Sequence, residues 1–210
     1  MKLLILTQKI DKNDSNLGFF HRWVEEFAKN CDSIIVVCLF LGEVSLPSNV
    51  KVVSLGKEKG VSRLRYLFNF YKYIWKHRKE YDNVFVHMNQ IYVILGGLIW
   101  RVFNKKIGLW YAHGGVSNSL RLAKRIANII FTSTPSGFRL KSKKIRIIGQ
   151  GIDEKIFKPN TEKRDKNVFK IITVGRISPV KNYETLILAI NRLKDKIENL
   201  IPHFEWVAKR

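Results

Sequence analysis

The sequence is poor in cysteine and in long apolar runs. Its 210 residues include two cysteines, Cys31 and Cys38, whose spacing fits neither a zinc site nor a disulfide framework. Both lie in or beside an apolar run, so we expect both to be reduced and buried. The longest apolar run, residues 91–100, falls well short of the roughly 20 residues that span a bilayer. Because Lys2 leads directly into a short apolar segment and then a polar loop, no signal peptide is expected. These features predict a cytoplasmic protein without a transmembrane helix.

Acidic side chains are also scarce. The chain has 17 Asp and Glu residues against 38 Lys and Arg residues, which gives a net charge of +21 and a pI of about 10.1. Such a field attracts polyanions, which include nucleic acids, anionic lipid surfaces and phosphorylated substrates. A biased genomic composition that adds surface lysines is an alternative explanation, and charge alone does not choose among these. The hydrophobic content of 46% and the charged content of 26% are typical of a folded globular protein.

The motifs of several common enzyme sites are missing. No G-x-G-x-x-G follows the first apolar segment, which disfavours a dinucleotide oxidoreductase, and no G-x-x-x-x-G-K-[ST] phosphate loop is present. No Asp-x-Asp occurs, which disfavours a metal-dependent site of that type. We therefore expect neither a metal ion nor a cofactor. Four histidines also lack the spacing of metal ligands, namely His21, His77, His87 and His203.

Short apolar runs alternate with longer segments of helical periodicity over the first 150 residues. Because the runs are apolar on both faces, the pattern predicts an α/β fold with a Rossmann-like, doubly wound parallel sheet. Ligands bind such sheets beyond the carboxyl ends of the strands, here expected after Thr7, Asn89 and His113. The expected strands are residues 2–7, 33–40, 49–55, 83–89, 106–113, 128–132 and 144–149, and the expected helices are residues 18–30, 61–79, 90–103 and 117–127.

A polar segment then separates a second, shorter pattern from the first. Residues 153–167 contain Pro159 and many charges, which predicts a linker. Beyond it, residues 168–174 and 203–207 are expected strands, and residues 182–193 are an expected amphipathic helix. One βαβ unit cannot bury both faces of its own sheet. We therefore expect a first domain at 1–152, the linker at 153–167, and an incomplete second Rossmann-like domain at 168–210.

A basic turn joins the first strand of this second pattern to its helix. The strand ends at Gly175, the turn carries Arg176 and Lys181, and the helix begins at about Asn182. Arginine can hold two phosphate oxygens while lysine adds a point charge, and a helix N-terminus favours anions. The turn is therefore a candidate diphosphate site. The alternative is a solvated loop with two ordinary basic residues.

The same turn carries a family resemblance. The run V-G-R-I-S-P-V-K, which ends at Lys181, resembles the signature of GT-B-fold retaining glycosyltransferases of family 4 (glycosyl transferases group 1). In that family the Arg and Lys hold the diphosphate of a nucleotide-sugar donor, which implies this role for Arg176 and Lys181, with Gly175 beside them. The stretch G-Q-G-I-D at residues 149–153, followed by Phe157 and Pro159, is similar to the family segment that leads into the second domain. Its glutamine stands where the family usually has Asn.

Two further positions follow from the resemblance. The stretch Y-A-H-G-G at residues 111–115 is similar to a family strand end whose His faces the donor sugar, which makes His113 the candidate catalytic residue. The alternative is a strand-end His that bonds to the backbone. Family members often carry a Gly-Gly pair after the first strand; here the single Gly18 opens the helix and is the candidate phosphate contact. The family's E-x7-E motif, which lies later in the second domain, does not occur after residue 193.

The helix expected at residues 61–79 is rich in aromatic and basic residues. Its basic residues Arg65, Lys72, Lys76 and Lys79, interleaved with aromatics, fit a membrane surface, a solvated face or nucleic acid. The resemblance favours the membrane, because many such enzymes act on lipid-linked acceptors. The apolar residues expected to face the sheet are Leu64, Leu67, Phe68, Tyr71, Ile74 and Trp75, with Tyr66, Phe70 and Tyr73 as an exposed stripe.

The resemblance implies a metal-independent enzyme that transfers a sugar, with retention, from a nucleotide diphosphate sugar to a glycan or lipid-linked acceptor. It would act in the cytoplasm, peripherally on the inner face of the membrane. The chain is expected to be a fragment with impaired activity, because the E-x7-E half of the site is missing. A non-catalytic remnant that binds an acceptor or a membrane surface is the alternative. No recognisable nucleic-acid reader motif is present, so no nucleic-acid partner is expected.

Overall fold

The computed structural model describes residues 1–154, 157–159, 169–175, 179–193, 196 and 200–206. The chain divides into two compact units, Met1–Gly151 and Ile152–Arg210, and each is described by itself. Arg176 and most of the expected linker lie outside the described residues. Within the described part, no helix is long and apolar enough to cross a bilayer.

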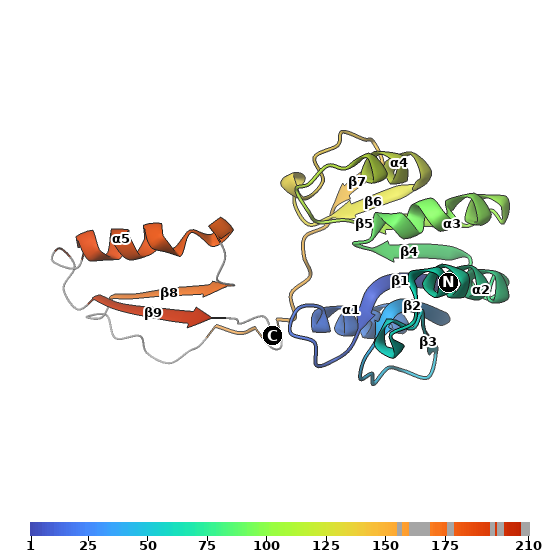
Figure 1. The fold of residues 1–210 in the computed structure, drawn as a ribbon, viewed down its shortest axis with the longest axis horizontal. Coiled ribbons are helices and arrows are strands. Elements are labelled where there is room, and N and C mark those ends of the chain that lie inside the picture. Colours follow the sequence, from blue (N-terminus) through green and yellow to red (C-terminus); the bar gives the residue numbers. More distant parts are fainter. Residues whose placement is uncertain (155–156, 160–168, 176–178, 194–195, 197–199, 207–210) are drawn as a thin grey trace. The chain divides into compact units, whose positions relative to one another are not determined.

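The first unit is built on a sheet in which all neighbouring strands are parallel (Figure 1). The strand order is β3-β2-β1-β4-β5-β6-β7, so successive crossovers run outward in both directions from β1 and β4. This confirms the Rossmann-like, doubly wound sheet and places its topological switch point between β1 and β4. The strands are β1 (Lys2–Ile10), β2 (Ser33–Leu41), β3 (Val50–Ser54), β4 (Asn83–His87), β5 (Lys106–Trp110), β6 (Ile129–Thr132) and β7 (Ile145–Ile147).

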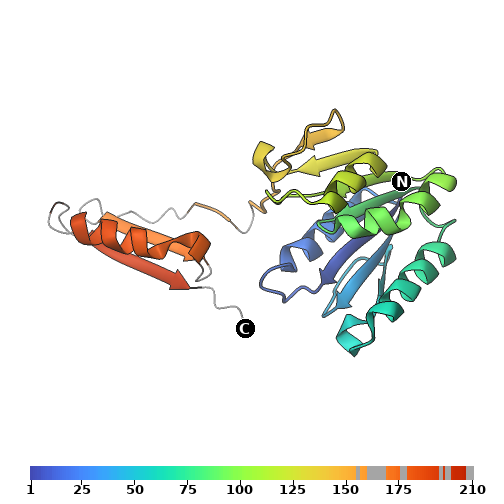
Figure 2. The ribbon, with the colours of Figure 1, turned by 45° about the horizontal axis from the view of Figure 1, so that its top comes forward.

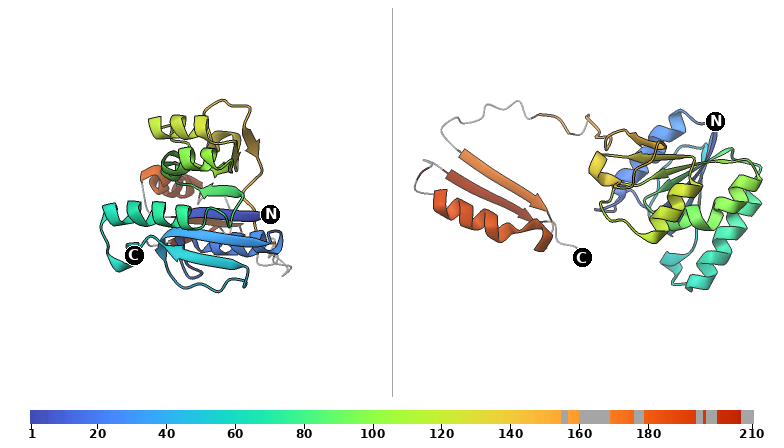
Figure 3. Two further views of the ribbon diagram at one scale, coloured as in Figure 1. Left: turned by 90° about the vertical axis from the view of Figure 1, so that its right-hand side faces the viewer. Right: turned by 90° about the horizontal axis from the view of Figure 1, so that it is seen from above.

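Helices cover both faces of this sheet (Figures 2 and 3). Alternate side chains of β1 enter opposite core layers: Leu4 and Leu6 pack on one side, and Leu3 and Ile5 on the other. Each fully buried aliphatic side chain of this kind contributes about 1.5–3 kcal/mol. The first layer is covered by α2 (Arg63–Lys76), α3 (Gln90–Val102) and α4 (Asn118–Ile126), and the second by α1 (Gly18–Lys29); two short 3-10 turns, η1 (Lys57–Lys59) and η2 (Pro135–Gly137), complete the unit.

Strand β1 is longer than the sequence pattern predicts. It continues three residues beyond Thr7, and Lys9 and Ile10 pair with Phe40 and Leu41 of β2. The continuation is possible because Ile10 is fully buried, while the Lys9 ammonium lies 4.6 Å from the centre of the Phe40 ring. The polar loop that follows β1 is therefore shorter than expected and covers residues 11–17.

The predicted orientation of helix α2 is wrong. Phe70 is buried and Tyr66 and Tyr73 are half-buried against the core, although they were expected to be exposed. Two stripes of the helix, 66-70-73-74 and 64-67-68-71-75, both have helical spacing and aromatic content, so periodicity alone does not choose between them. Of the residues expected to face the sheet, Ile74 is buried and Tyr71 half-buried, whereas Leu64, Leu67, Phe68 and Trp75 are exposed.

The second unit contains a single βαβ motif among its described residues. Strands β8 (Phe169–Gly175) and β9 (Leu200–Trp206) are parallel neighbours, and η3 (Pro179–Lys181) and α5 (Tyr183–Leu193) connect them. Strand β9 begins three residues before the expected His203. None of the residues of α5 is buried, and Leu188 is 61% exposed. This agrees with the expectation that one βαβ motif cannot cover its own apolar surfaces.

Both cysteines match their prediction. Cys31 and Cys38 are free and buried in the layer under α1. Burial raises the pKa of the Cys38 thiol to about 12, so this thiol stays protonated at neutral pH.

Candidate active site

The carboxyl ends of β1, β4 and β5 meet at one edge of the first sheet, as the parallel pairing requires. Three segments leave this edge: residues 11–17 toward α1, Met88 and Asn89 toward α3, and residues 111–117 toward α4. Because the sheet order reverses between β1 and β4, this is the edge at which doubly wound folds bind ligands. It carries His113 and Gly18, two of the predicted site residues.

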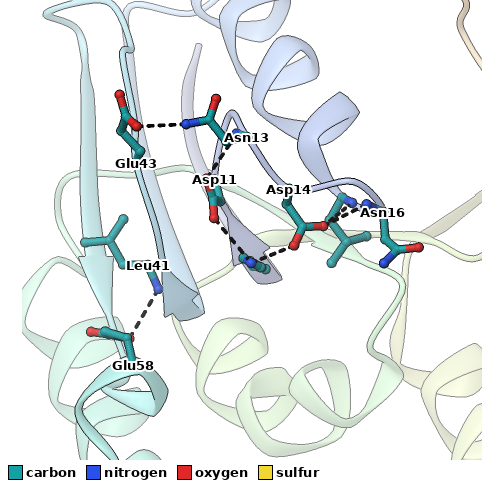
Figure 4. Close-up of polar contacts among 9 residues, drawn as sticks. Asp11, Asn13, Asp14, Asn16, Leu41, Glu43 and Glu58 are labelled. Atoms are coloured by element: carbon teal, nitrogen blue, oxygen red, sulfur yellow. Dashed lines mark hydrogen bonds and ion pairs between the residues drawn. The ribbon is translucent and has the colours of Figure 1, made fainter. Parts of the chain in front are cut away.

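The loop after β1 is held by ion pairs (Figure 4). The ammonium of Lys9 lies 2.6 Å from a carboxylate oxygen of Asp14 and 3.2 Å from one of Asp11. The hydrogen bond from Lys9 to Asp14 raises the pKa of Lys9 and lowers the pKa of Asp14. Asp14 also accepts hydrogen bonds from the amides of Asn16 and Leu17. The loop is therefore folded against the start of α1 by its own charges.

Gly18 is half-buried at the first turn of α1. Its amide N–H donates to the carbonyl oxygen of Asp14 at 2.9 Å. This N–H is therefore already bonded within the loop, and a phosphate contact at Gly18 would need to use a different group or displace this bond. The role of Gly18 toward the donor remains a prediction.

His113 is exposed in the loop after β5, and three hydrogen bonds fix that loop. Its backbone N–H donates to the carbonyl of Gly137, and its Nδ1 accepts from the amide of Gly115 at 3.0 Å. The Tyr111 hydroxyl donates to the Gly115 carbonyl at 3.3 Å. Because Nδ1 is an acceptor, the neutral ring carries its proton on Nε2. Nε2 is therefore a hydrogen-bond donor, of the kind that an oxygen of a sugar accepts.

His87, the last residue of β4, is a component of this edge that the sequence did not single out. It is 1% exposed, its Nδ1 lies 3.2 Å from the Thr7 hydroxyl, and its ring stacks on Phe20 at 3.9 Å. Burial lowers the pKa of His87 to about 3, so the ring is neutral at physiological pH. No hydrogen-bond partner of Nε2 is found among the described residues. Its place at the carboxyl end of a buried strand is the one sequence signal that could have found it.

The residue after His87 has an unusual backbone. Met88 has a φ of 61°, which is uncommon for a residue other than glycine and is often found at functional sites. Its amide donates to the carbonyl of Trp110, and its sulfur accepts from the amide of Ala112 at 3.4 Å. Met88 thus ties the end of β4 to the loop that carries His113.

The second unit carries the other predicted residues. Gly175 ends β8, and a Cβ at this position would lie 2.6 Å from the Tyr183 hydroxyl oxygen and 3.8 Å from Cε of Lys181. The stem of Lys181 therefore lies beside the end of β8, as a basic group next to a phosphate-binding turn would. Asn182 precedes α5 with a φ of 46°. Arg176, which the sequence placed in the same turn, lies outside the described residues.

Metal-binding groups are not apparent in the part of the chain that the structure describes. No cluster of three or more His, Cys, Asp or Glu side chains there could hold a metal ion. Gly149 and Gly151, in the segment that leads out of the first unit, have left-handed backbones with φ of 77° and 68°. That geometry explains why glycine occupies both positions of the G-Q-G stretch.

Comparison with known proteins finds solved structures with a similar fold but does not assign the chain to a family. No family model and no curated protein matches the chain. Among solved structures, HepE of Anabaena in complex with UDP matches with a TM-score of 0.58 at 15% identity, over 98% of this chain and 70% of that one. The lipopolysaccharide outer core galactosyltransferase WaaB in its apo form matches with a TM-score of 0.57 at 11% identity, over 99% and 69%. A UDP-GlcNAc 2-epimerase from Methanocaldococcus jannaschii matches with a TM-score of 0.54 at 17% identity, over 99% and 66%.

These likenesses extend over both units of the chain. They agree with the α/β Rossmann-like architecture and with the GT-B fold that the sequence resemblance implies. At identities of 11–17% they concern the fold, and the activity of this chain has to be argued from its own residues.

Proposed function

We propose that the protein is a glycosyltransferase that moves a sugar, with retention of configuration, from a nucleotide diphosphate sugar to a glycan or lipid-linked acceptor. The observation that carries the proposal is the basic turn of the second unit, where Lys181 lies beside Gly175 at the carboxyl end of β8. A solved structure of the same fold was obtained with UDP and another with UDP-glucose, which supports a nucleotide diphosphate as the ligand of this turn.

The chemistry assigned to the turn is stabilisation of the leaving diphosphate. When the bond between the sugar and the diphosphate breaks, negative charge grows on the phosphate oxygens. The guanidinium of Arg176 and the ammonium of Lys181 would stabilise that charge, and placed cations of this kind lower the barrier because they need no reorganisation. Gly175 would allow the diphosphate to approach the backbone.

On the first unit, we assign the sugar contact to His113. Its Nε2–H would donate a hydrogen bond to an oxygen of the transferred sugar, while Gly115 and Gly137 hold the residue in place. Gly18, at the same sheet edge as His113, stays the candidate phosphate contact of the first unit. No protein nucleophile is assigned, because the retaining family that the sequence resembles has none that is clear.

The proposal is tested with radiolabelled UDP- and GDP-sugars and the 210-residue chain. We expect release of the nucleotide diphosphate, with Lys181→Ala and Arg176→Ala each lowering the rate on the order of 10²-fold. Lys196→Ala is the matched control, because Lys196 is an exposed lysine of the same unit outside the turn. Equal loss in the control, or turnover that is unchanged in both turn variants, would contradict the assignment.

Epimerisation of a nucleotide sugar is a second candidate, because an epimerase structure matches 99% of the chain. The two activities separate when UDP-GlcNAc is incubated without an acceptor. An epimerase converts UDP-GlcNAc into its 2-epimer, a product that carries the diphosphate and that NMR detects directly, whereas a transferase leaves the configuration at C2 unchanged. A chain that binds the donor and does neither would support the third possibility, a non-catalytic module that binds an acceptor or a membrane surface.

A further inference from the structure

Helices α2 and α3 share an apolar surface that nothing in the first unit covers. On α2, Leu64 is 80% exposed, Phe68 59% and Trp75 54%, and on α3, Leu98 is 75% exposed and Val102 73%. Single exposed apolar residues are ordinary, but a group of large ones on adjoining elements indicates an interaction site. The surface formed by these five side chains is called the α2–α3 face below.

The two helices form one continuous surface. The Tyr71 hydroxyl donates to the carbonyl of Leu95 at 3.2 Å, and the rings of Trp75 and Phe103 lie 5.6 Å apart. An open groove of about 480 Å³ runs along their junction, lined by Phe68, Tyr71, Lys72, Trp75, Lys76 and Ile99. Lys72 and Lys76 thus border a strip of aromatic and aliphatic carbon.

Helices α2, α3 and α4 carry cations and no acidic residue. Residues 83–152 contain no Asp or Glu at all, and neither does α2. Arginines also lie against the exposed rings: the guanidinium of Arg78 is 4.8 Å from the Trp75 ring centre, and that of Arg65 is 5.7 Å from the Phe68 ring centre. The helices α2, α3 and α4 together present eight basic residues, Arg63, Arg65, Lys72, Lys76, Arg101, Arg121, Lys124 and Arg125.

We infer that the α2–α3 face docks on an anionic lipid bilayer, with its apolar side chains entering the interface and its cations bound to lipid headgroups. Both halves of this chemistry are needed: anionic headgroups attract the basic residues, and the acyl boundary takes up the aromatic and aliphatic carbon. Nucleic acid would satisfy the cations and stack on Phe68 and Trp75, but it would leave Leu98 and Val102 in water. The inference stands on this surface alone and does not depend on the proposed function.

The structure also changes which residues make the contact. The sequence pattern predicts a membrane contact through four basic residues of the helix, with Phe68 and Trp75 facing the core. With these rings exposed, binding has an apolar component that salt does not screen. Adsorption through charge alone would be abolished at high salt, whereas docking through this face is expected to be weakened and not lost.

Sedimentation with vesicles of phosphatidylcholine, with and without phosphatidylglycerol, tests the inference on the full chain. We expect binding that requires phosphatidylglycerol. The triple variant Phe68→Ser, Trp75→Ser, Leu98→Ser should bind at least about 10-fold more weakly, because each side chain loses part of its transfer free energy. The matched control is Ile147→Ser, Ile148→Ser, Ile152→Ser, which replaces three equally exposed apolar residues elsewhere and should bind as the wild type does. Unchanged binding of the first variant overturns the inference.

A second pair of variants tests the contribution of charge to bilayer binding. Replacing Arg65, Lys72, Lys76 and Lys79 by Ala should weaken binding on the order of 10²-fold or more at low salt. Replacing Lys2, Lys29, Lys51 and Lys106, all exposed and outside the α2–α3 face, gives the same net charge and should have a much smaller effect. Equal losses in the two variants would mean that net charge, and not this face, attracts the bilayer, and would overturn the inference.

Fluorescence quenching by brominated lipids locates the inserted ring. A Trp23→Phe, Trp206→Phe background retains Trp75, Trp100 and Trp110, of which Trp100 and Trp110 are buried. In that background Trp75 is expected to account for most of the quenching, and adding Trp75→Phe should leave vesicle binding while losing that signal. Quenching that persists after this addition contradicts insertion of this face. Circular dichroism melting curves matching the wild type show that each variant is folded. Preferential binding to a DNA duplex over the vesicles, lost in the triple variant, would also overturn the lipid assignment.

Discussion

The amide of Gly115 donates a hydrogen bond of 3.0 Å to Nδ1 of His113. This short contact across one turn sets the tautomer of the imidazole and leaves its Nε2–H as a donor. A residue held this way can bond a sugar oxygen without first reorganising. The order of the residues in the Y-A-H-G-G stretch therefore has a physical reason, because the second glycine positions the histidine.

His113 should be required for transfer and not for folding. We expect His113→Ala to lower the rate on the order of 10²-fold, which is typical for loss of one hydrogen-bond donor at a reacting centre. Its melting temperature should stay within about a degree or two of the wild type, because surface substitutions change stability by about 0.5 kcal/mol or less. His113→Gln, whose amide offers an N–H donor, should recover part of the activity. A normal rate for His113→Ala would remove this residue from the site.

Gly115→Ala should act through His113. A Cβ at position 115 would lie 2.9 Å from Nδ1 of His113, so the ring has to move. We expect a rate decrease of about 10-fold or more, since small displacements of positioned groups are costly in catalysis. In the His113→Ala background the same substitution should have almost no further effect. Additive losses in the double variant would show that Gly115 acts independently of the ring.

His87 should make the first unit sensitive to acid. Its pKa is lowered to about 3 in the folded protein by burial, against an ordinary value of about 6.5 in the unfolded chain. The unfolded chain therefore binds more protons between these values, so stability is complete above pH of about 6.5 and falls as the pH is lowered toward 3. His87→Phe removes the titration and should flatten the difference between melting temperatures at neutral and acidic pH. An identical pH profile in both proteins would contradict the assignment.

Lys144 should stabilise the end of α4. Its ammonium donates to the carbonyls of Lys124, Arg125 and Ala127 at 3.2, 3.1 and 2.7 Å. Lys144→Met leaves these carbonyls without that cation and should destabilise the unit by about 1–3 kcal/mol. Lys143→Met is the control, because Lys143 is exposed. Urea unfolding should separate the two variants, and equal midpoints would show that the contacts contribute nothing.

The thiols should be unreactive in the native protein. Cys31 and Cys38 are buried, and burial raises the pKa of both. We expect iodoacetamide to modify both cysteines in urea and neither at an appreciable rate in buffer, as mass spectrometry would show. Fast native modification of Cys38 would mean that the layer under α1 opens readily.

The sheet could be predicted from sequence because its strands are apolar on both faces, and few folds other than a covered parallel sheet accept such strands. The end of β1 could not be predicted, since the charged Lys9 is accommodated in the strand by ion pairs with Asp11 and Asp14 and by its contact with Phe40. Periodicity could not predict the orientation of α2 either, because two aromatic stripes of this helix have the same spacing and either could face the core.

The candidate site likewise contains residues that the sequence singled out and one, His87, that it did not. His113 was found through a motif that includes its own positioning glycine. His87 carries no motif, and only the stacking on Phe20 and the hydrogen bond with Thr7 mark it as part of the edge. Lys181 was singled out through the basic turn after Gly175 and through its family resemblance, and the structure adds that its stem lies against the end of β8.

The turn after β8 is proposed to bind the diphosphate of a nucleotide sugar. Isothermal titration of the full chain with UDP, GDP and their sugars measures this directly, whether or not transfer occurs. We predict binding of at least one of these nucleotides, weakened about 10-fold or more in Lys181→Ala through loss of a charge-assisted hydrogen bond, and unchanged in Lys196→Ala. Failure of every nucleotide to bind, or binding that Lys181→Ala and Arg176→Ala leave intact, would contradict it.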